Sequence, residues 1–337
     1  MKPNKPMRWI LTIAILSIIL MVSIAVSLCV GEVSIPFKGL ASILSDTSSM
    51  EYGVLAYIRI PRTVLAFSIG GSLSISGAIL QGIYRNPLVE PYTLGISGGA
   101  SLGITFIIIS GLYLTHILFM PLAGFIGALA TILLVYTLSM RKGGLNTNRM
   151  LLIGVMISFI ASSLIMFLMS VTTAENIHSI VFWTMGSLNE SNPLLIRFML
   201  IASLAGLAIT YLFAMPLNAL RLGEEKAKHL GINTTMVIKI LFVLTSLLTG
   251  ISISVAGIIG FVGLIIPHFV RLIIGNDYRI MLISSFLCGS IFLIVCDIIA
   301  RTIIAPNELP IGVITGIVGG ITFIFMLSRS KIQSKFM

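Results

Sequence analysis

Long runs of apolar residues, separated by short polar stretches, follow one another along nearly the whole chain. A helix needs about 20 apolar residues to cross the roughly 30 Å hydrocarbon core of a bilayer. Runs of this length predict an all-α integral membrane protein of about ten transmembrane helices, formed as one domain over residues 1–337. The predicted spans are 9–30, 62–83, 92–111, 117–139, 150–171, 193–213, 236–256, 257–275, 280–300 and 310–328.

The composition supports this class of protein. Apolar residues make up 57% of the chain and charged residues only 9%, whereas a soluble domain carries about 25% charged residues. The net charge of +10 does not indicate nucleic-acid binding, because no basic face interleaved with aromatic residues is present. The first apolar run is too long for a signal peptide and predicts a retained span.

The distribution of lysine and arginine predicts the orientation. Basic residues gather in the cytoplasmic loops of membrane proteins. With the N-terminus in the cytoplasm, sixteen basic residues fall on the cytoplasmic side and five on the external side. The ten spans then place both termini in the cytoplasm, with an external loop at 31–61, a cytoplasmic segment at 214–235 and a cytoplasmic tail at 329–337.

Prolines interrupt two of the apolar regions. Pro87 and Pro91 break the first region at 85–91, since proline lacks a backbone donor and disfavours helix before it. Irregular backbone survives in a membrane only when it is buried in protein or lines an aqueous cavity. The break is therefore either an ordinary loop at the membrane face or part of a permeation path. A second break at 266–280 lies in the corresponding part of the other half, which predicts an inverted repeat.

Three motifs carry a resemblance to a known family. The first is R-I-P-R with S-G-A-I-L-Q-G, R-N-P-L-V-E-P and L-G-I-S-G-G-A-S-L-G between Arg59 and Gly103. The second is G-F-V-G-L-I-I-P-H-F-V-R, Gly260 to Arg271, and the third is E-L-P-I-G, Glu308 to Gly312. In this order the chain resembles the membrane-spanning permease subunits of type II ABC importers for iron-siderophores, haem and vitamin B12.

The resemblance implies a complete transport machine of which this chain is one part. Two permease subunits, as a homodimer or with a paralogue, would assemble with two ABC ATPase subunits in a bacterial inner membrane. A substrate-binding protein outside the cell would deliver an iron(III)-siderophore complex, with haem or cobalamin as alternative substrates. The chain has no G-x-x-x-x-G-K-[ST] loop to bind ATP phosphates. It would therefore be a non-enzymatic subunit without a cofactor, and ATP and Mg²⁺ would bind the partner ATPase.

The most polar stretch between spans predicts the ATPase contact. Charged residues exclude it from the bilayer, and apolar residues at helical spacing predict a short amphipathic helix ending at a glycine cap. The alternative is a solvated loop. The resemblance favours the helix that couples the permease to the ATPase, formed by Leu222, Gly223, Glu224, Glu225, Ala227, Leu230 and Gly231.

Three arginines on the predicted external side lie close to the ends of predicted spans, namely Arg59, Arg62 and Arg301. Arginines near helix ends commonly reach the interface to solvate their charge, which needs no function. The resemblance implies instead that these three residues dock the substrate-binding protein, a role that suits charges at the rim of an interface.

Residues of the first break and of the fifth span are candidates for the translocation pathway. The resemblance implies that Asn86, Pro87 and Leu88 narrow its cytoplasmic end, although an asparagine beside a proline commonly only satisfies backbone groups. Gly154 and Ser158 lie on a small, uncharged face of the span at 150–171, which the resemblance places along the pathway.

Asp297 is the one acidic residue deep in an apolar span. A lone carboxylate there costs about 2.5–3.5 kcal/mol, so a partner is expected, and Arg301 lies four residues on, on the same helix face. The spacing predicts an intramembrane ion pair. The alternative from another class of protein is a secondary, ion-coupled transporter in which Asp297 carries the proton. Neither the cysteines nor the histidines have the spacing of a metal site, so no metal site is predicted.

Overall fold

The structure is a computed structural model that describes residues 5–31, 35–39, 43, 45–141, 144–145 and 147–329. Most of the predicted tail at 329–337 lies outside the described residues. Within the described residues, seven helices are long and apolar enough to cross a membrane, and the second of them continues from short helical segments that precede it. They are built on α1 (Lys5–Cys29), α4 (Ile60–Tyr84), α6 (Phe119–Ser139), α7 (Thr147–Ser170), α9 (Pro193–Tyr211), α12 (Thr234–Ala256) and α14 (Tyr278–Thr302).

Three shorter apolar helices complete the predicted set of spans, namely α5 (Ile96–Ile109), α13 (Val262–Ile274) and α15 (Ile311–Arg329). The all-helical membrane fold is thus confirmed. The connections contain α3 (Met50–Val54), α8 (Ala174–Thr184), α10 (Ala214–Leu220) and α11 (Glu224–His229), the short helical turns η1 (Phe37–Gly39), η2 (Leu55–Arg59), η3 (Pro91–Leu94) and η4 (Leu112–Leu114), and a two-residue antiparallel pair, β1 (Met140–Arg141) with β2 (Gly144–Leu145).

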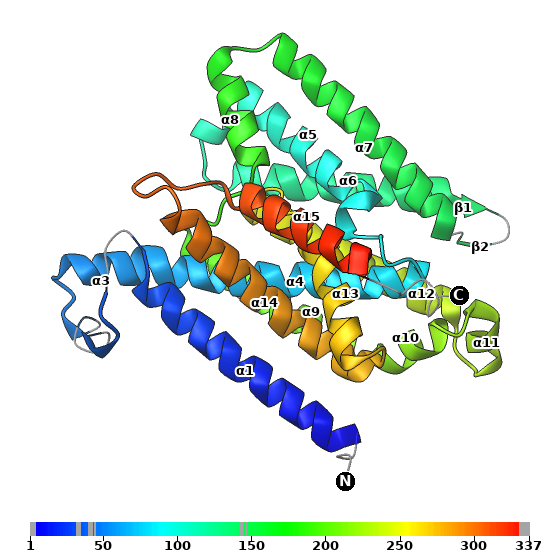
Figure 1. Cartoon of the computed structure of the whole chain (residues 1–337). Helices are drawn as coiled ribbons and strands as arrows, with labels where there is room; N and C mark the ends of the chain where they lie inside the picture. Colours follow the sequence, from blue (N-terminus) through cyan, green and yellow to red (C-terminus); the bar gives the residue numbers. More distant parts are fainter. Residues whose placement is uncertain are drawn as a thin grey trace.

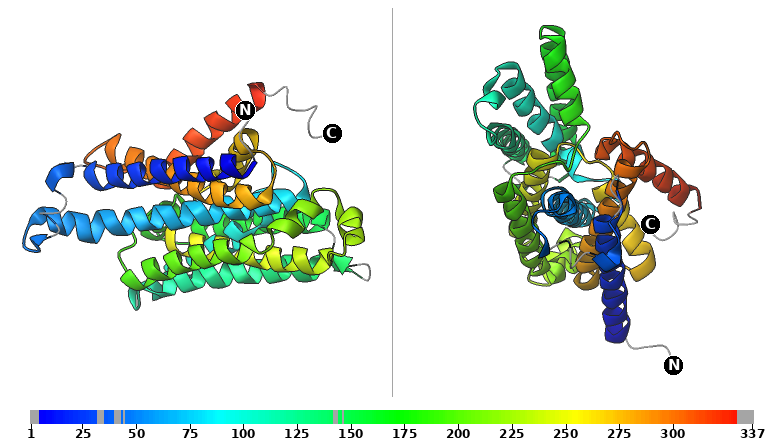
Figure 2. Two further views of the ribbon diagram at one scale, coloured as in Figure 1. Left: turned by 90° about the horizontal axis from the view of Figure 1, so that it is seen from below. Right: turned by 90° about the vertical axis from the view of Figure 1, so that its left-hand side faces the viewer.

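The helices form a bundle with two distinct ends (Figures 1 and 2). One end, here called the α11 end, carries α10, α11, the β1–β2 pair, the start of α1 and the end of α15. The opposite end, here called the α8 end, carries α3, α8 and the connection between α14 and α15. The described ends of the first and last helices therefore lie on one side, together with the predicted coupling segment.

Helix α4 forms the centre of the bundle. In its most apolar window 89% of the residues are buried, against 17% for α1 and 11% for α7. It packs against α14, α12, α13 and α9, while α1 lies on the outside against α14. Glycines allow this close packing: a Cβ at Gly70 would collide with the carbonyl oxygen of Gly289, and a Cβ at Gly77 with that of Gly263. Small residues at crossings let membrane helices approach closely.

The second span begins earlier than predicted. Helical backbone runs from Met50 to Tyr84, so the predicted external loop at 31–61 is shorter. The predicted span begins at residue 62, and Pro61 lies in the first turn of α4, a position that proline tolerates. The structure places the wide helical turn η2 directly before it, and such a turn accommodates the local change in hydrogen bonding.

Two predicted spans are only partly helical. The spans at 92–111 and 257–275 contain α5 and α13, of 14 and 13 residues, which at 1.5 Å per residue are about 20 Å long. A residue with left-handed backbone immediately precedes each helix: Gly95, with φ of 82°, precedes α5, and Phe261, with φ of 69°, precedes α13. The residues before these positions are irregular or form the short turn η3.

The helix is not broken at the second proline, Pro267. Pro267 sits inside α13, which continues to Ile274, so the prediction of a break beginning at residue 266 was wrong. Proline there removes the hydrogen bond to the carbonyl four residues earlier. That carbonyl, of Gly263, accepts instead from Nε2 of Gln81 at 3.3 Å, which explains how the helix continues through the proline.

Candidate functional site

The predicted coupling segment is exposed at the α11 end, and α11 is the one short helix between Leu222 and Gly231. Gly223, with φ of 108°, separates α10 from α11. Glu224 and Glu225 form the first turn of α11, where acidic side chains stabilise the helix dipole. The glycine cap is present: Gly231, with φ of 81°, donates to the Lys228 carbonyl at 2.9 Å, as in the common left-handed helix ending.

The apolar residues of this segment do not share one buried face. Ala227 is fully buried, whereas Leu222 is 59% and Leu230 64% exposed. Two exposed leucines that flank the short polar helix α11 cost hydration free energy unless another surface covers them. The segment therefore has the features of a contact surface for a separate protein.

The connection between α4 and α5 interlocks with the connection between α12 and α13. The hydroxyl of Tyr92 donates to the Ile259 carbonyl at 2.9 Å and accepts from the Ile259 N–H at 3.1 Å. Burial raises the pKa of the nearby Glu90 carboxyl from 4.5 to about 7, and the backbone N–H of Phe261 offsets only part of that effect. The two halves of the chain thus contact each other next to the proline break at 85–91, which the sequence predicted to be either a loop or part of a permeation path.

The proline break itself forms a compact turn. Asn86 Oδ1 accepts from the Leu88 N–H at 2.9 Å, the side-chain turn that asparagine commonly makes. Leu88 is 54% exposed, and Asn86 and Pro87 line a polar cavity at the α11 end. Their proposed gating role stays a prediction.

The two candidate residues of α7 lie in different environments. Gly154 is buried where a Cβ would come within 2.7 Å of the Leu94 backbone, so it is a packing position rather than a lining one. Ser158 is partly buried and lines a second cavity, of about 320 Å³, together with Glu90 and Tyr92. A pathway role for α7 stays a prediction.

A buried ionic cluster lies at the α8 end. Asp297 is fully buried, and its Oδ1 accepts from Nε of Arg62 at 2.6 Å. Nε of Arg301 lies 3.0 Å from the other carboxylate oxygen, but its N–H points to the Asp297 backbone carbonyl at 3.4 Å, so that contact is ionic rather than a well-aligned hydrogen bond. The predicted pair of Asp297 with Arg301 is present, with a second and closer arginine that the spacing did not reveal.

Glu308, Asn189 and Ser27 complete the cluster. Nη1 of Arg62 donates to both carboxylate oxygens of Glu308, at 2.9 and 2.7 Å. Burial opposes ionisation of Glu308, but the hydrogen bond and charge of Arg62 lower its pKa below 4.5. Asn189 donates to the same carboxylate at 3.2 Å, and Nη2 of Arg301 donates to Ser27 Oγ at 3.0 Å. Glu308 stands in the third sequence motif, which was a signal for its importance without indicating its role.

The three predicted docking arginines are not rim charges in this structure. Arg59, Arg62 and Arg301 are only 2%, 4% and 6% exposed. Nη1 of Arg59 donates to the carbonyls of Leu28 and Cys29, at 2.7 and 3.0 Å. Neighbouring parts of the structure cover all three side chains. The sequence did not predict this burial, because residue spacing along one helix does not reveal a partner on another. Docking through them stays a prediction that their burial disfavours.

Comparison with known proteins agrees with this architecture. The sequence matches the FecCD transport family over residues 19–329. It is 35% identical over 328 residues to the hemin transport system permease protein HmuU of Yersinia pestis, covering 96% of this chain and 97% of that one. It is 34% identical over 331 residues to the vitamin B12 import system permease protein BtuC of Klebsiella pneumoniae, covering 98% and 96%.

A solved structure shares the fold. It is described as an inward-facing conformation of a metal-chelate type ABC transporter and superimposes with a TM-score of 0.84 at 29% identity, covering 94% of this chain and 99% of that one. The all-helical membrane fold and the similarity to named permeases over nearly the full length place the chain in the permease class of ABC importer subunits. Within that class, the chain belongs to the FecCD transport family.

Proposed function

We propose that this permease imports an iron(III)-siderophore complex, delivered by an external substrate-binding protein and driven by partner ATPases in a bacterial inner membrane. The observation that carries the proposal is the match in fold, over nearly the full length of both chains, to a transporter described as of metal-chelate type. Among the described residues no group of three or more His, Cys, Asp and Glu could hold a metal ion. This favours a cargo that carries its own metal ligands.

The α11 end supports the coupling part of the proposal. The exposed leucines of the coupling segment fit a groove on an ATPase, and ATP with Mg²⁺ would bind that partner. A second permease subunit, identical or paralogous, would cover the exposed face of α7. Nucleic acid has no place in this assembly.

Haem and cobalamin are alternative substrates of the same machinery, since two relatives of this chain are named for hemin and vitamin B12 transport. The ion-coupled alternative is less well supported. Its proton carrier, Asp297, is fully buried and ion-paired with Arg62 and Arg301, as expected of charged groups that pair with one another inside a membrane protein.

The test is uptake of labelled ferric siderophores, haem and cobalamin, in parallel, in a strain that lacks the gene. We expect loss of ferric-siderophore uptake, restored by the intact gene. Loss of haem or cobalamin uptake alone would assign that substrate instead. Uptake that persists when ATP is depleted and stops when an uncoupler is added would indicate the ion-coupled transporter. Co-purification of the chain with a P-loop ATPase tests the partner independently of the substrate.

A further inference from the structure

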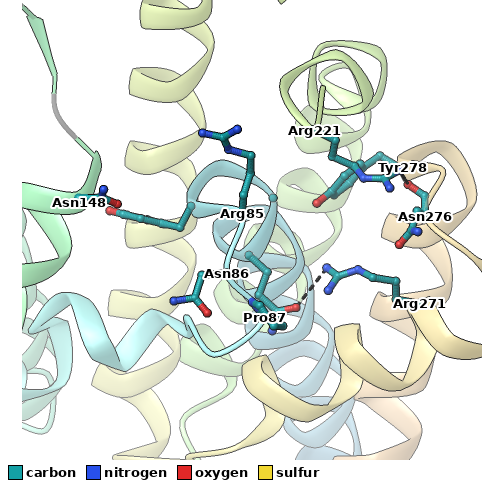
Figure 3. A pocket seen from close by; sticks show the side chains of 11 residues that line it. Arg85, Asn86, Pro87, Asn148, Arg221, Arg271, Asn276 and Tyr278 are labelled. Atoms are coloured by element: carbon teal, nitrogen blue, oxygen red, sulfur yellow. Dashed lines mark hydrogen bonds between the residues drawn. The ribbon is translucent and has the colours of Figure 1, made fainter. Parts of the chain in front are cut away.

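A polar cavity of about 580 Å³ opens at the α11 end, apart from the ionic cluster at the other end. Its walls come from the end of α4, the start of α7, the end of α10, the end of α13 and the start of α14. Figure 3 shows Arg85 between Asn148 on one side and Arg221 and Arg271 on the other. Among the described residues, three arginines and no acidic side chain line the cavity.

The arginines come from three elements that are distant in sequence. Arg85 follows α4 in the left-handed conformation, with φ of 48°; Arg221 follows α10, and Arg271 lies in the last turn of α13. Three like charges around one cavity repel each other unless a counter-charge is present. The arrangement is therefore more stable with an anion than without one.

Most of the guanidinium donors remain available. Nη1 of Arg221 donates to the Asn276 carbonyl at 2.7 Å, and Nη2 of Arg271 donates to Gln81 Oε1 at 3.2 Å. The Arg85 side chain makes no hydrogen bond to another described residue, and it is exposed. Each guanidinium carries five N–H donors, so these contacts orient the groups and use only a few of them.

A buried hydroxyl without a partner also lines the cavity. Tyr84 is only 9% exposed, and its hydroxyl has no hydrogen-bond partner among the described residues. A buried polar group left unpaired is destabilising, because it has lost its hydrogen bonds to water. The amides of Asn86, Asn148 and Asn276 line the same space, so neutral donors accompany the three charges.

We propose that this cavity binds a phosphate group, either in the headgroup of an anionic phospholipid or as a soluble phosphate. Arginine is the side chain best suited to phosphate, because its planar donors form paired hydrogen bonds to two oxygens. Basic pockets between membrane helices bind phospholipid headgroups on the cytoplasmic side. A phosphate bound by Arg85, Arg221 and Arg271 would connect three parts of the chain: the segment after α4, the segment after α10 and the end of α13.

The test uses the purified full-length chain in nanodiscs of phosphatidylcholine. The probes are phosphatidylglycerol added to the nanodisc and, separately, inorganic phosphate, with acetate as a carboxylate comparison. The readouts are the midpoint of thermal unfolding and the lipid retained in native mass spectrometry. We expect a higher midpoint with a phosphate probe, because a ligand that binds only the folded state stabilises it. Response to phosphatidylglycerol alone identifies the headgroup as the source, and response to both probes identifies the phosphate itself.

Substitutions locate the binding. The double variant Arg85→Gln with Arg221→Gln is expected to weaken phosphate binding by about tenfold or more per arginine. Lys228→Gln removes one exposed charge from α11 outside the cavity and is expected to bind as the unmodified chain does. If the double variant does not fold, Arg85→Gln alone gives the test, since its side chain has no hydrogen bond to lose.

Three results would overturn the proposal. The first is the absence of stabilisation and of retained lipid with either phosphate probe. The second is an unchanged response in the arginine variants. The third is a response to acetate as strong as that to phosphate, which would indicate a site for the carboxylate of another protein.

Discussion

Arg62 of α4 and Asp297 of α14 stand 235 positions apart in the chain, and their side chains meet at 2.6 Å in the buried end of the bundle. Asp297 also lies within 3.0 Å of Arg301. One carboxylate thus contacts an arginine of its own helix and an arginine of α4, the helix that packs along α14.

Loss of this carboxylate should destabilise the protein strongly. Asp297→Asn removes the counter-charge of buried Arg301 and leaves buried Arg62 with Glu308 alone, and breaking a buried pair in this way costs about 3–5 kcal/mol. We expect that loss in the free energy of unfolding of the detergent-solubilised chain.

The matched control is the exposed pair of Asp277 with Arg279, at 2.6 Å near the α11 end. Arg279→Gln should change stability little, because exposed ion pairs contribute little. Equal stability of Asp297→Asn and the unmodified chain would contradict the structural role. If Arg301→Gln weakened docking of the binding protein with stability unchanged, the docking role predicted from sequence would be restored.

The crossing of α4 and α13 should not tolerate a methyl group. Gly77→Ala places a Cβ against the Gly263 carbonyl oxygen, and overpacking of this kind costs about 1–3 kcal/mol. Gly320→Ala on α15 is the control, since nothing lies within 4 Å of its added Cβ. Thermal unfolding of the two variants in detergent gives the comparison, and a stable Gly77→Ala chain would show that α4 and α13 can separate at their crossing without loss of stability.

Glu90 should make stability depend on pH. Its pKa is raised to about 7 by burial, so the folded chain holds the proton more tightly than the unfolded chain does. Stability is therefore expected to fall as pH rises from about 4.5 to 7, and to stay level above that. Glu90→Gln should remove this dependence and be more stable than the unmodified chain by about 1–3 kcal/mol at pH 8.

The control for Glu90 is Glu225→Gln, which removes an exposed carboxylate from α11. The measurement is the free energy of unfolding of both variants and of the unmodified chain from pH 4.5 to 8. Parallel pH profiles for Glu90→Gln and the unmodified chain would mean that Glu90 does not carry the effect.

A charge in place of the exposed Leu230 in the coupling segment should reduce uptake. Leu230 is 64% exposed, so Leu230→Asp should leave folding intact while it places a charge in an apolar contact with the ATPase. Buried apolar anchors at interfaces contribute most of the binding energy, and we expect uptake to fall at least about tenfold. Leu230→Met keeps the apolar area and should transport normally. Normal uptake by Leu230→Asp would exclude Leu230 from the coupling contact.

Hydropathy and local spacing predicted the features that depend on residues close together in the chain. These are the ten apolar segments, the glycine cap at Gly231 and the pair of Asp297 with Arg301. The pairing of Arg62 with Asp297 and the support of the Gly263 carbonyl by Gln81 depend on which helices become neighbours. No local pattern contains that information, and for the same reason the three arginines appeared exposed. Pro267 was misleading because its missing hydrogen bond is compensated by a side chain from α4.

The bonds between Tyr92 and Ile259 have a consequence for how the subunit moves. One hydroxyl holds both the donor and the acceptor of a single residue, so the halves cannot slide past each other without losing both bonds at once. Helices in membranes exchange such bonds only with other protein groups, because lipid offers none. The connection between α4 and α5 and the connection between α12 and α13 are therefore expected to move together, as one unit, whenever the subunit changes conformation.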